Sequence, residues 1–89
     1  MTTWDEGKRK SNLARHGVDL ALAGRFDFES ALVEEDRDAR GEQRFRAIGW
    51  IDNRLCYLVY TERGDEMHAI SLRPVTPQER RHYEKEKRL

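Results

Sequence analysis

The spacing of hydrophobic and polar residues changes along the chain from a helical period to an alternating one. Residues 5–16 are predicted to form a helix, because Asp5 is a suitable N-cap and Gly17 can adopt the left-handed conformation that ends a helix. A second short helix is predicted to begin at Asp19, since the apolar residues near it recur at helical spacing. These residues are Val18, Ala21, Leu22 and Phe26.

Period-two alternation follows and predicts β-strands. The four predicted strands are residues 31–36, 44–51, 54–61 and 67–73. The first is the weakest, and the third is nearly all apolar, which is typical of a central strand covered on both faces. In the last strand, alternation is expected to place Met67, Ala69 and Ser71 on one face and Ile70 and Leu72 on the other.

Turn signals separate the predicted strands. Asp52-Asn53 and Gly64-Asp65 are natural two-residue turns, and residues 38–42 are expected to form a polar loop. Since the strands follow one another so closely, an antiparallel sheet of about four strands is the simplest topology.

The strongest local signal is a capping box, Thr76-x-x-Glu79, which predicts a C-terminal helix from residue 77 to about residue 87. This helix has almost no apolar stripe, only Tyr83 and Leu89. Either Tyr83 anchors it lightly or a partner covers it. The predicted fold class is α+β: two N-terminal helices, the antiparallel sheet and the C-terminal helix, in one domain over residues 1–89.

The composition indicates a small core under a densely charged surface. Charged residues make up 38% of the 89 positions and hydrophobic residues 37%. Net charge is zero, because 17 Lys and Arg residues balance 17 Asp and Glu residues. A dedicated nucleic-acid-binding protein is usually more basic, but basic residues prevail after Arg73, which predicts a local basic surface. Trp4 and Trp50 are expected in the core rather than as platforms for stacked bases.

The single cysteine, Cys56, cannot form an internal disulfide, and its apolar neighbours predict a buried structural thiol. A reducing cytoplasm fits this usage. The N-terminus has no apolar signal region, and no run approaches the roughly 20 apolar residues that span a bilayer. We therefore expect a cytoplasmic protein without membrane contact.

The candidate chemistry does not involve a metal, because His16, His68 and His82 lie far apart and no Cys/His cluster is present. The remaining charged and aromatic residues suit one metal-free reaction. In RNA, the ribose 2′-hydroxyl attacks the adjacent phosphate, and a protein needs only to supply positive charge and to move protons. Composition alone supports this hypothesis weakly, since any charged surface contains such residues.

Five residues are candidates for catalysis, and each also has a structural interpretation. His68 can be an ordinary strand histidine, and His16 lies at a helix C-terminus, where the dipole favours a cation. Arg73 can be a solvated arginine at the end of a strand. Tyr83 can be the anchor of the last helix, and Lys8 can be a surface residue that aids solubility.

Three groups of residues form a pattern across the chain. The first group is Trp4-Asp5-Glu6, Lys8, Asn12 and His16-Gly17-Val18-Asp19. The second is Glu42, Arg44, Ile48-Gly49 and Tyr60-Thr61-Glu62-Arg63-Gly64, and the third is Ile70-Ser71, Arg73, Thr76, Glu79-Arg80 and Tyr83. In order and spacing, over residues 4–84, this pattern resembles the BrnT toxin family.

The resemblance implies a RelE-like fold and a cofactor-free endoribonuclease that arrests translation. It also implies a BrnA-like antitoxin that binds DNA, so that a toxin–antitoxin hetero-oligomer represses its own operon and this chain meets DNA only indirectly. In RelE-like toxins, basic side chains of the sheet and a C-terminal tyrosine act in catalysis, and Arg73 and Tyr83 stand at such places. Four further arginines are expected to contact RNA: Arg44, Arg46, Arg63 and Arg80.

The chain departs from the family pattern R-I-I-S-A-R-K-A-T near the last strand, where His68 replaces an arginine and Pro74 replaces a lysine. If those cations hold phosphates, cleavage would be weaker, whereas His68 could instead serve as an acid or base. Three hypotheses therefore stay open: an endoribonuclease toxin, an antitoxin-binding corepressor with weak nuclease activity, and a non-enzymatic module that pairs through an edge strand or the last helix.

Overall fold

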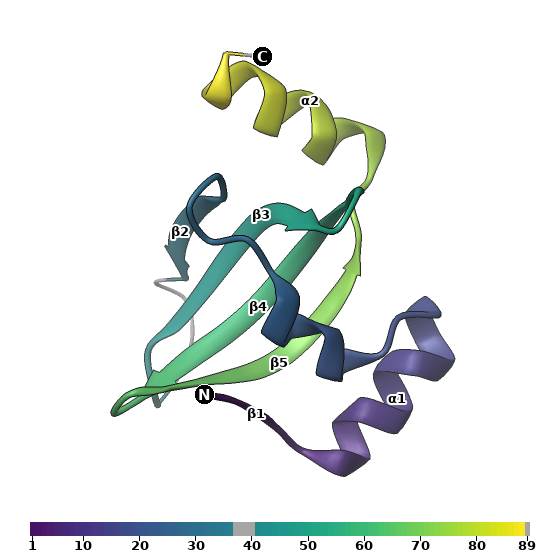
Figure 1. Cartoon of the computed structure of the whole chain (residues 1–89), viewed down its shortest axis with the longest axis vertical. Helices are drawn as coiled ribbons and strands as arrows, with labels where there is room; N and C mark the ends of the chain where they lie inside the picture. Colours follow the sequence, from purple (N-terminus) through teal and green to yellow (C-terminus); the bar gives the residue numbers. More distant parts are fainter. Residues whose placement is uncertain (37–40, 89) are drawn as a thin grey trace.

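The chain folds around a five-stranded mixed sheet whose strands lie in the order β1-β5-β4-β3-β2 (Figure 1). The computed structural model describes residues 1–36 and 41–88. The strands are β1 (Thr2–Trp4), β2 (Leu32–Asp36), β3 (Arg44–Ile51), β4 (Arg54–Arg63) and β5 (Glu66–Pro74). The helices are α1 (Glu6–His16), the 3-10 helix η1 (Leu20–Arg25) and α2 (Pro77–Lys87). Figure 1 shows η1 across one face of the sheet and α2 at the opposite end of the molecule from α1.

The predicted α+β class and C-terminal helix are confirmed, but the predicted four-stranded antiparallel sheet is wrong in two respects. A fifth strand, β1, was missed, and it pairs with β5 in parallel, which makes the sheet mixed. β1 has three residues, too few for alternation to show, and its partner strand lies more than 60 positions away. The second predicted helix is also corrected, since η1 is a 3-10 helix rather than an α-helix.

The first helix begins and ends where its caps predict. The Asp5 carboxylate accepts a hydrogen bond from the Lys8 backbone N–H at 3.0 Å. Gly17 adopts a φ of 68°, and its N–H donates to the Leu13 carbonyl at 2.9 Å. These short-range contacts fix both ends of α1.

Strand alternation separates two apolar clusters on opposite faces of the sheet. The main core consists of Val18, Leu20, Ala23, Phe26, Ala31, Ala47, Ile51, Cys56, Leu58, Tyr60, Ala69 and Leu72. A second, smaller cluster consists of Ile48, Leu55 and Tyr83. Trp4 packs against the main core and Trp50 against the smaller cluster, and both are partly buried there. Burial of Cys56 raises the pKa of its thiol, in keeping with a structural role.

A β-bulge in β5 overturns the alternation predicted for residues 67–73. The register between β4 and β5 shifts between Val59 and Tyr60, which leaves Ile70 as an extra residue in β5. As a result, Ala69 and Leu72 are both fully buried in the main core, although they are three positions apart. The bulge therefore changes which residues after position 70 face the core.

The C-terminal helix is held by Tyr83, the first of the two alternatives that the sequence left open. The predicted capping box is present: the Glu79 N–H donates to Thr76 Oγ1, and the Thr76 N–H donates to the Glu79 carboxylate. Tyr83 is 2% exposed, and its hydroxyl donates to the Ser30 carbonyl at 2.9 Å. Leu89, the other predicted apolar contact, and residues 38–40 of the predicted polar loop lie outside the described residues.

No helix within the described residues is long and apolar enough to cross a membrane.

Candidate functional site

The face of the sheet opposite the main core carries most of the residues predicted to act on RNA. Residues paired across neighbouring strands share a face, so the strand register defines this outer face. Its side chains form three rows: Leu32, Ile48, Tyr57 and Arg73; then Glu34, Arg46, Val59 and Ser71; then Asp36, Arg44, Thr61, His68 and Thr3. Arg63 of β4 follows the same parity as Tyr57 and Thr61.

The bulge at Ile70 is what brings two of the predicted residues to the same face. His68 and Arg73 are five positions apart, and in a regular strand an odd separation places side chains on opposite faces. The extra residue restores a common face for both. Arg44, Arg46, His68 and Arg73 therefore share the outer face.

The Arg73 side chain is held by contacts with Glu79 and Tyr57 rather than extended into solvent. Its guanidinium donates two hydrogen bonds to the Glu79 carboxylate, at 2.7 and 2.8 Å, and lies 4.4 Å from the centre of the Tyr57 ring. The hydrogen bonds from Arg73 hold the pKa of Glu79 below its ordinary value, and the same pair raises the pKa of Arg73. Arg73 thus joins the end of β5 to the first turn of α2.

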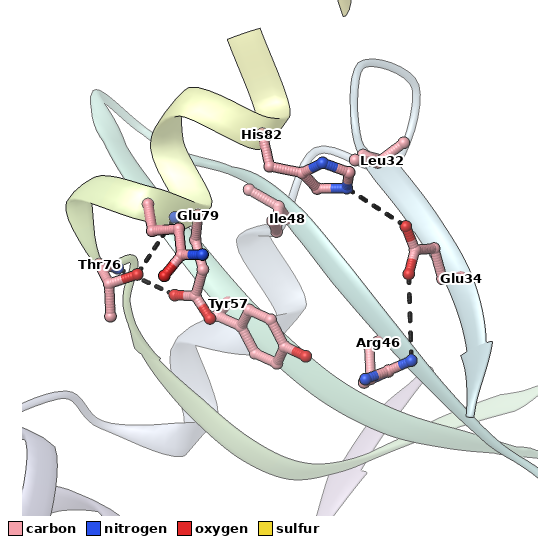
Figure 2. A pocket seen from close by; sticks show the side chains of 9 residues that line it. Leu32, Glu34, Arg46, Ile48, Tyr57, Thr76, Glu79 and His82 are labelled. Carbon is pink, nitrogen blue, oxygen red and sulfur yellow. Dashed lines mark hydrogen bonds and ion pairs between the residues drawn. The ribbon is translucent and has the colours of Figure 1, made fainter. Parts of the chain in front are cut away.

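A groove of about 460 Å³ lies between α2 and the outer face (Figure 2). Its lining comprises Leu32, Glu34, Arg46, Ile48, Tyr57, Thr76, Gln78, Glu79 and His82. Figure 2 shows a chain of charged groups along one wall. His82 Nε2 lies 3.4 Å from one Glu34 carboxylate oxygen, and Arg46 lies 4.0 Å from the other. The groove thus combines an apolar floor with an imidazole, carboxylates and a guanidinium, a composition suited to binding a small ligand that has both polar and apolar parts.

A second group of predicted residues gathers at the β4–β5 turn end of the outer face. Arg63 donates to the Glu42 carboxylate at 3.0 and 3.3 Å, and this contact is the main cause of the lowered pKa of Glu42. Nearby positive charge on His68 and Arg44 contributes to the same shift. His68 Nδ1 shares a hydrogen bond of 2.8 Å with Thr3 Oγ1. Among the described residues, Arg44 Nε is buried without a hydrogen-bond partner.

Lys8 and His16 lie apart from the groove. Both line a smaller pocket of about 250 Å³ between α1 and β5, which Ser11, Asn12, Arg15, Ile70 and Ser71 complete. The pocket includes Ser71 of the outer face, so it borders that face at the bulge.

The two remaining predicted residues belong to α2. Arg80 is exposed, with its guanidinium 5.8 Å from the centre of the Trp50 ring. Tyr83 is buried in the smaller cluster with its hydroxyl bonded to a backbone carbonyl, which identifies it as an anchor of the helix. In this arrangement the Tyr83 hydroxyl already donates to the Ser30 carbonyl.

Sequence reasoning missed three residues of the groove as site residues. Tyr57 lies in an apolar run that predicts only a core strand, and Glu34 lies in the weakest predicted strand. For His82, the sequence indicates no role beyond that of a possible metal ligand. No sequence signal joins Glu34 to His82, because they are 48 positions apart and meet only when α2 packs over the sheet. Within residues 1–36 and 41–88, no three His, Cys, Asp or Glu side chains are grouped so as to hold a metal ion.

Comparison with known proteins identifies the family. A family model described as the ribonuclease toxin BrnT of type II toxin–antitoxin systems matches residues 4–79. The crystal structure of the Brucella abortus ribonuclease toxin BrnT is similar, with a TM-score of 0.69 and 30% sequence identity, over 85% of this chain and 97% of that chain. A search of curated proteins gave no match. The family match runs from Trp4, the last residue of β1, through β5 to Glu79 in the first turn of α2, and it confirms the resemblance predicted from the sequence. The chain therefore belongs to the BrnT family of ribonuclease toxins of type II toxin–antitoxin systems.

Proposed function

We propose that the chain is an endoribonuclease that cleaves RNA on the outer face of the sheet without a metal ion. The observation that carries this proposal is the gathering of Arg44, Arg46, Arg73 and His68 on one face of a sheet that matches a ribonuclease family. In the reaction, the 2′-oxygen bonds to the adjacent phosphorus as the bond to the 5′-oxygen breaks. The products are a 2′,3′-cyclic phosphate and a 5′-hydroxyl.

The arginines supply the positive charge that the transition state requires. Arg46 is the best placed to bind the phosphate directly, since its side chain is 44% exposed and its ion pair with Glu34 is a long one. Arg73 already donates to Glu79, so it contributes mainly by holding α2 in place. Arg44, Arg63 and His68 extend the surface along which RNA lies.

Lys8, His16 and Arg80 serve as outer contacts in this proposal. The pocket that Lys8 and His16 share borders the outer face, so an RNA strand that leaves the face at Ser71 meets both side chains. Arg80 sits on α2 beside Trp50. Phosphate contacts of this kind add affinity without sequence preference.

The family membership supports the wider part of the proposal. Cleavage of RNA in the cytoplasm arrests translation, and a BrnA-like antitoxin binds the chain in a hetero-oligomer and neutralises it. The antitoxin contacts DNA, so the chain reaches the operon only through its partner.

Controlled expression tests the function directly. Expression of this chain is expected to arrest bacterial growth, and purified protein is expected to cleave RNA in the presence of a chelator. Arg46→Ala is expected to slow cleavage about 100-fold, as loss of a transition-state donor does elsewhere, with an unchanged melting temperature. Arg54→Ala removes an exposed arginine that lies outside the outer-face rows, and it serves as the matched control.

Normal growth with a soluble, folded chain that leaves RNA intact would contradict the nuclease proposal. It would favour the alternative motivated by His68 and Pro74, a corepressor that only binds its antitoxin.

A further inference from the structure

We propose that His82 is the general base of RNA cleavage, with Glu34 orienting its imidazole and Arg46 binding the phosphate beside it. This inference rests on the proposed ribonuclease function and assigns the proton transfer within it. It places the reaction in the groove beneath α2.

The groove has the size and lining that a nucleotide needs. Its volume of about 460 Å³ falls within the range of small-molecule sites, roughly 300–1,000 Å³. Leu32 and Ile48 form an apolar floor on which a base or ribose can lie, and the Tyr57 hydroxyl carries no hydrogen bond from the described residues. In Figure 2 the Tyr57 hydroxyl and Arg46 lie on the same side of the groove, below Glu34 and His82.

The contact with Glu34 prepares His82 to accept a proton. A neutral imidazole that donates from Nε2 to a carboxylate carries its lone pair on Nδ1, and Nδ1 is then the basic atom. The Nε2–Oε1 distance of 3.4 Å is long, but catalytic hydrogen bonds commonly shorten only when substrate binds. The two side chains are 46% and 52% exposed, so a substrate can reach them.

Charged groups from every neighbouring element favour this role. Glu34 from β2 stabilises the imidazolium that forms, while Arg46 from β3 offsets the charge of the phosphate. Glu79 from α2 is neutralised by Arg73, so it does not compete for Arg46. One wall of the groove thus holds three groups side by side: the proposed base, the carboxylate that orients it and the cation that binds phosphate.

The other two histidines lack this combination. His68 has one ring nitrogen engaged with Thr3, and it does not line the groove. His16 shares its pocket with Lys8 and Arg15, and that pocket has no carboxylate among the described residues that line it. The structure therefore favours His82 over the two histidines that the sequence put forward.

Neutral His82 takes the 2′-hydroxyl proton at Nδ1 as the 2′-oxygen bonds to phosphorus, and the bond from phosphorus to the 5′-oxygen breaks. The departing 5′-oxygen takes a proton from water.

Single-turnover cleavage of one RNA oligonucleotide by the full chain tests the assignment. His82→Gln is expected to slow cleavage about 100-fold, within the usual contribution of a general base, and to abolish the rise of rate with pH through the histidine range. Glu34→Gln is expected to slow cleavage by a smaller factor and to keep that rise. The matched control, Glu84→Gln, changes an exposed residue of α2 that does not line the groove, and it is expected to keep both the pH profile and the wild-type rate.

A leaving-group test separates a base from an acid. The same oligonucleotide with a bridging 5′-phosphorothiolate has a sulfur that departs without protonation. His82→Gln is expected to stay about 100-fold slow on it, because deprotonation of the 2′-hydroxyl is still required.

Three results would overturn the inference. Wild-type rates for His82→Gln, with wild-type cleavage intact, would remove His82 from the reaction and leave the ribonuclease function standing. Full recovery of His82→Gln on the phosphorothiolate would make it an acid instead. A wild-type chain that cleaves neither substrate would remove the ribonuclease function and this inference together.

Discussion

At the scale of single residues, Asn12 shows how one buried amide can join distant segments. Its side-chain nitrogen donates to the carbonyls of Val18 and Leu72, at 2.8 and 2.7 Å, and its oxygen accepts from the Leu72 N–H at 3.0 Å. Asn12 is 5% exposed, so these bonds replace contacts that water would otherwise make. They fasten α1 to β5 two residues after the bulge.

Asn12→Ala is therefore expected to destabilise the chain by about 3 kcal/mol, because it leaves several buried backbone groups unpaired. Urea unfolding measures this loss. Ser11→Ala is the matched control, since Ser11 is an exposed neighbour that bonds only to Gly7 within the helix, and it should change stability by less than about 0.5 kcal/mol. A loss below about 1 kcal/mol for Asn12→Ala would mean that water replaces the lost amide.

At the scale of elements, α2 depends on two tertiary contacts rather than on an apolar stripe. Tyr83 inserts into the smaller cluster, and the Arg73–Glu79 pair ties the first turn to β5. Both members of that pair are less than one third exposed, so solvent screens the pair only in part. The attachment of α2 should therefore respond to pH through Glu79.

The folded-state pKa of Glu79 is depressed, chiefly by its hydrogen bonds from Arg73. Its stabilisation is therefore complete above the unfolded pKa of about 4.3 and is lost as pH falls through the lower folded value. Glu79→Gln is expected to cost about 1–2 kcal/mol at pH 7 and to flatten the decline of the unfolding free energy between about pH 5 and pH 3.

Urea titrations across that pH range measure the effect, with Glu84→Gln, an exposed glutamate of the same helix, as the control. An acid limb as steep in Glu79→Gln as in the wild type would show that other carboxylates govern the acid sensitivity.

At the scale of the whole molecule, a neutral chain must concentrate its positive charge to hold RNA. The 17 basic and 17 acidic residues cancel overall, and the outer face collects Arg44, Arg46, Arg63 and Arg73. Three of these arginines have carboxylate partners, which lower the net positive charge of the outer face. RNA affinity should therefore come from a small number of phosphate contacts.

The salt dependence of binding counts those contacts. The probe is a 2′-O-methyl oligonucleotide, which cannot be cleaved. A plot of the logarithm of its association constant against the logarithm of the salt concentration is expected to have a slope of roughly −2 to −3, because three or four phosphate contacts require such a value. Arg46→Ala should reduce the slope by about 0.7. A slope near zero would indicate that the outer face does not bind the RNA backbone.

The sequence by itself determined the features that arise from short-range contacts. Asp5 and Gly17 delimit α1, and the Thr76–Glu79 capping box begins α2, because each cap forms between residues at most four positions apart. Alternation likewise located β3 and its neighbours, and the spacing of residues 4–84 indicated the family. The candidate arginines could be named, but not their grouping on one face.

Only the tertiary structure decided the pairings between distant segments. β1 is a strand because it pairs with β5. The bulge at Ile70 depends on the register between β4 and β5. The meeting of His82 with Glu34 depends on where Tyr83 anchors α2. Hydrogen bonds and packing across such separations form only once the sheet is assembled, so no local pattern of residues encodes them.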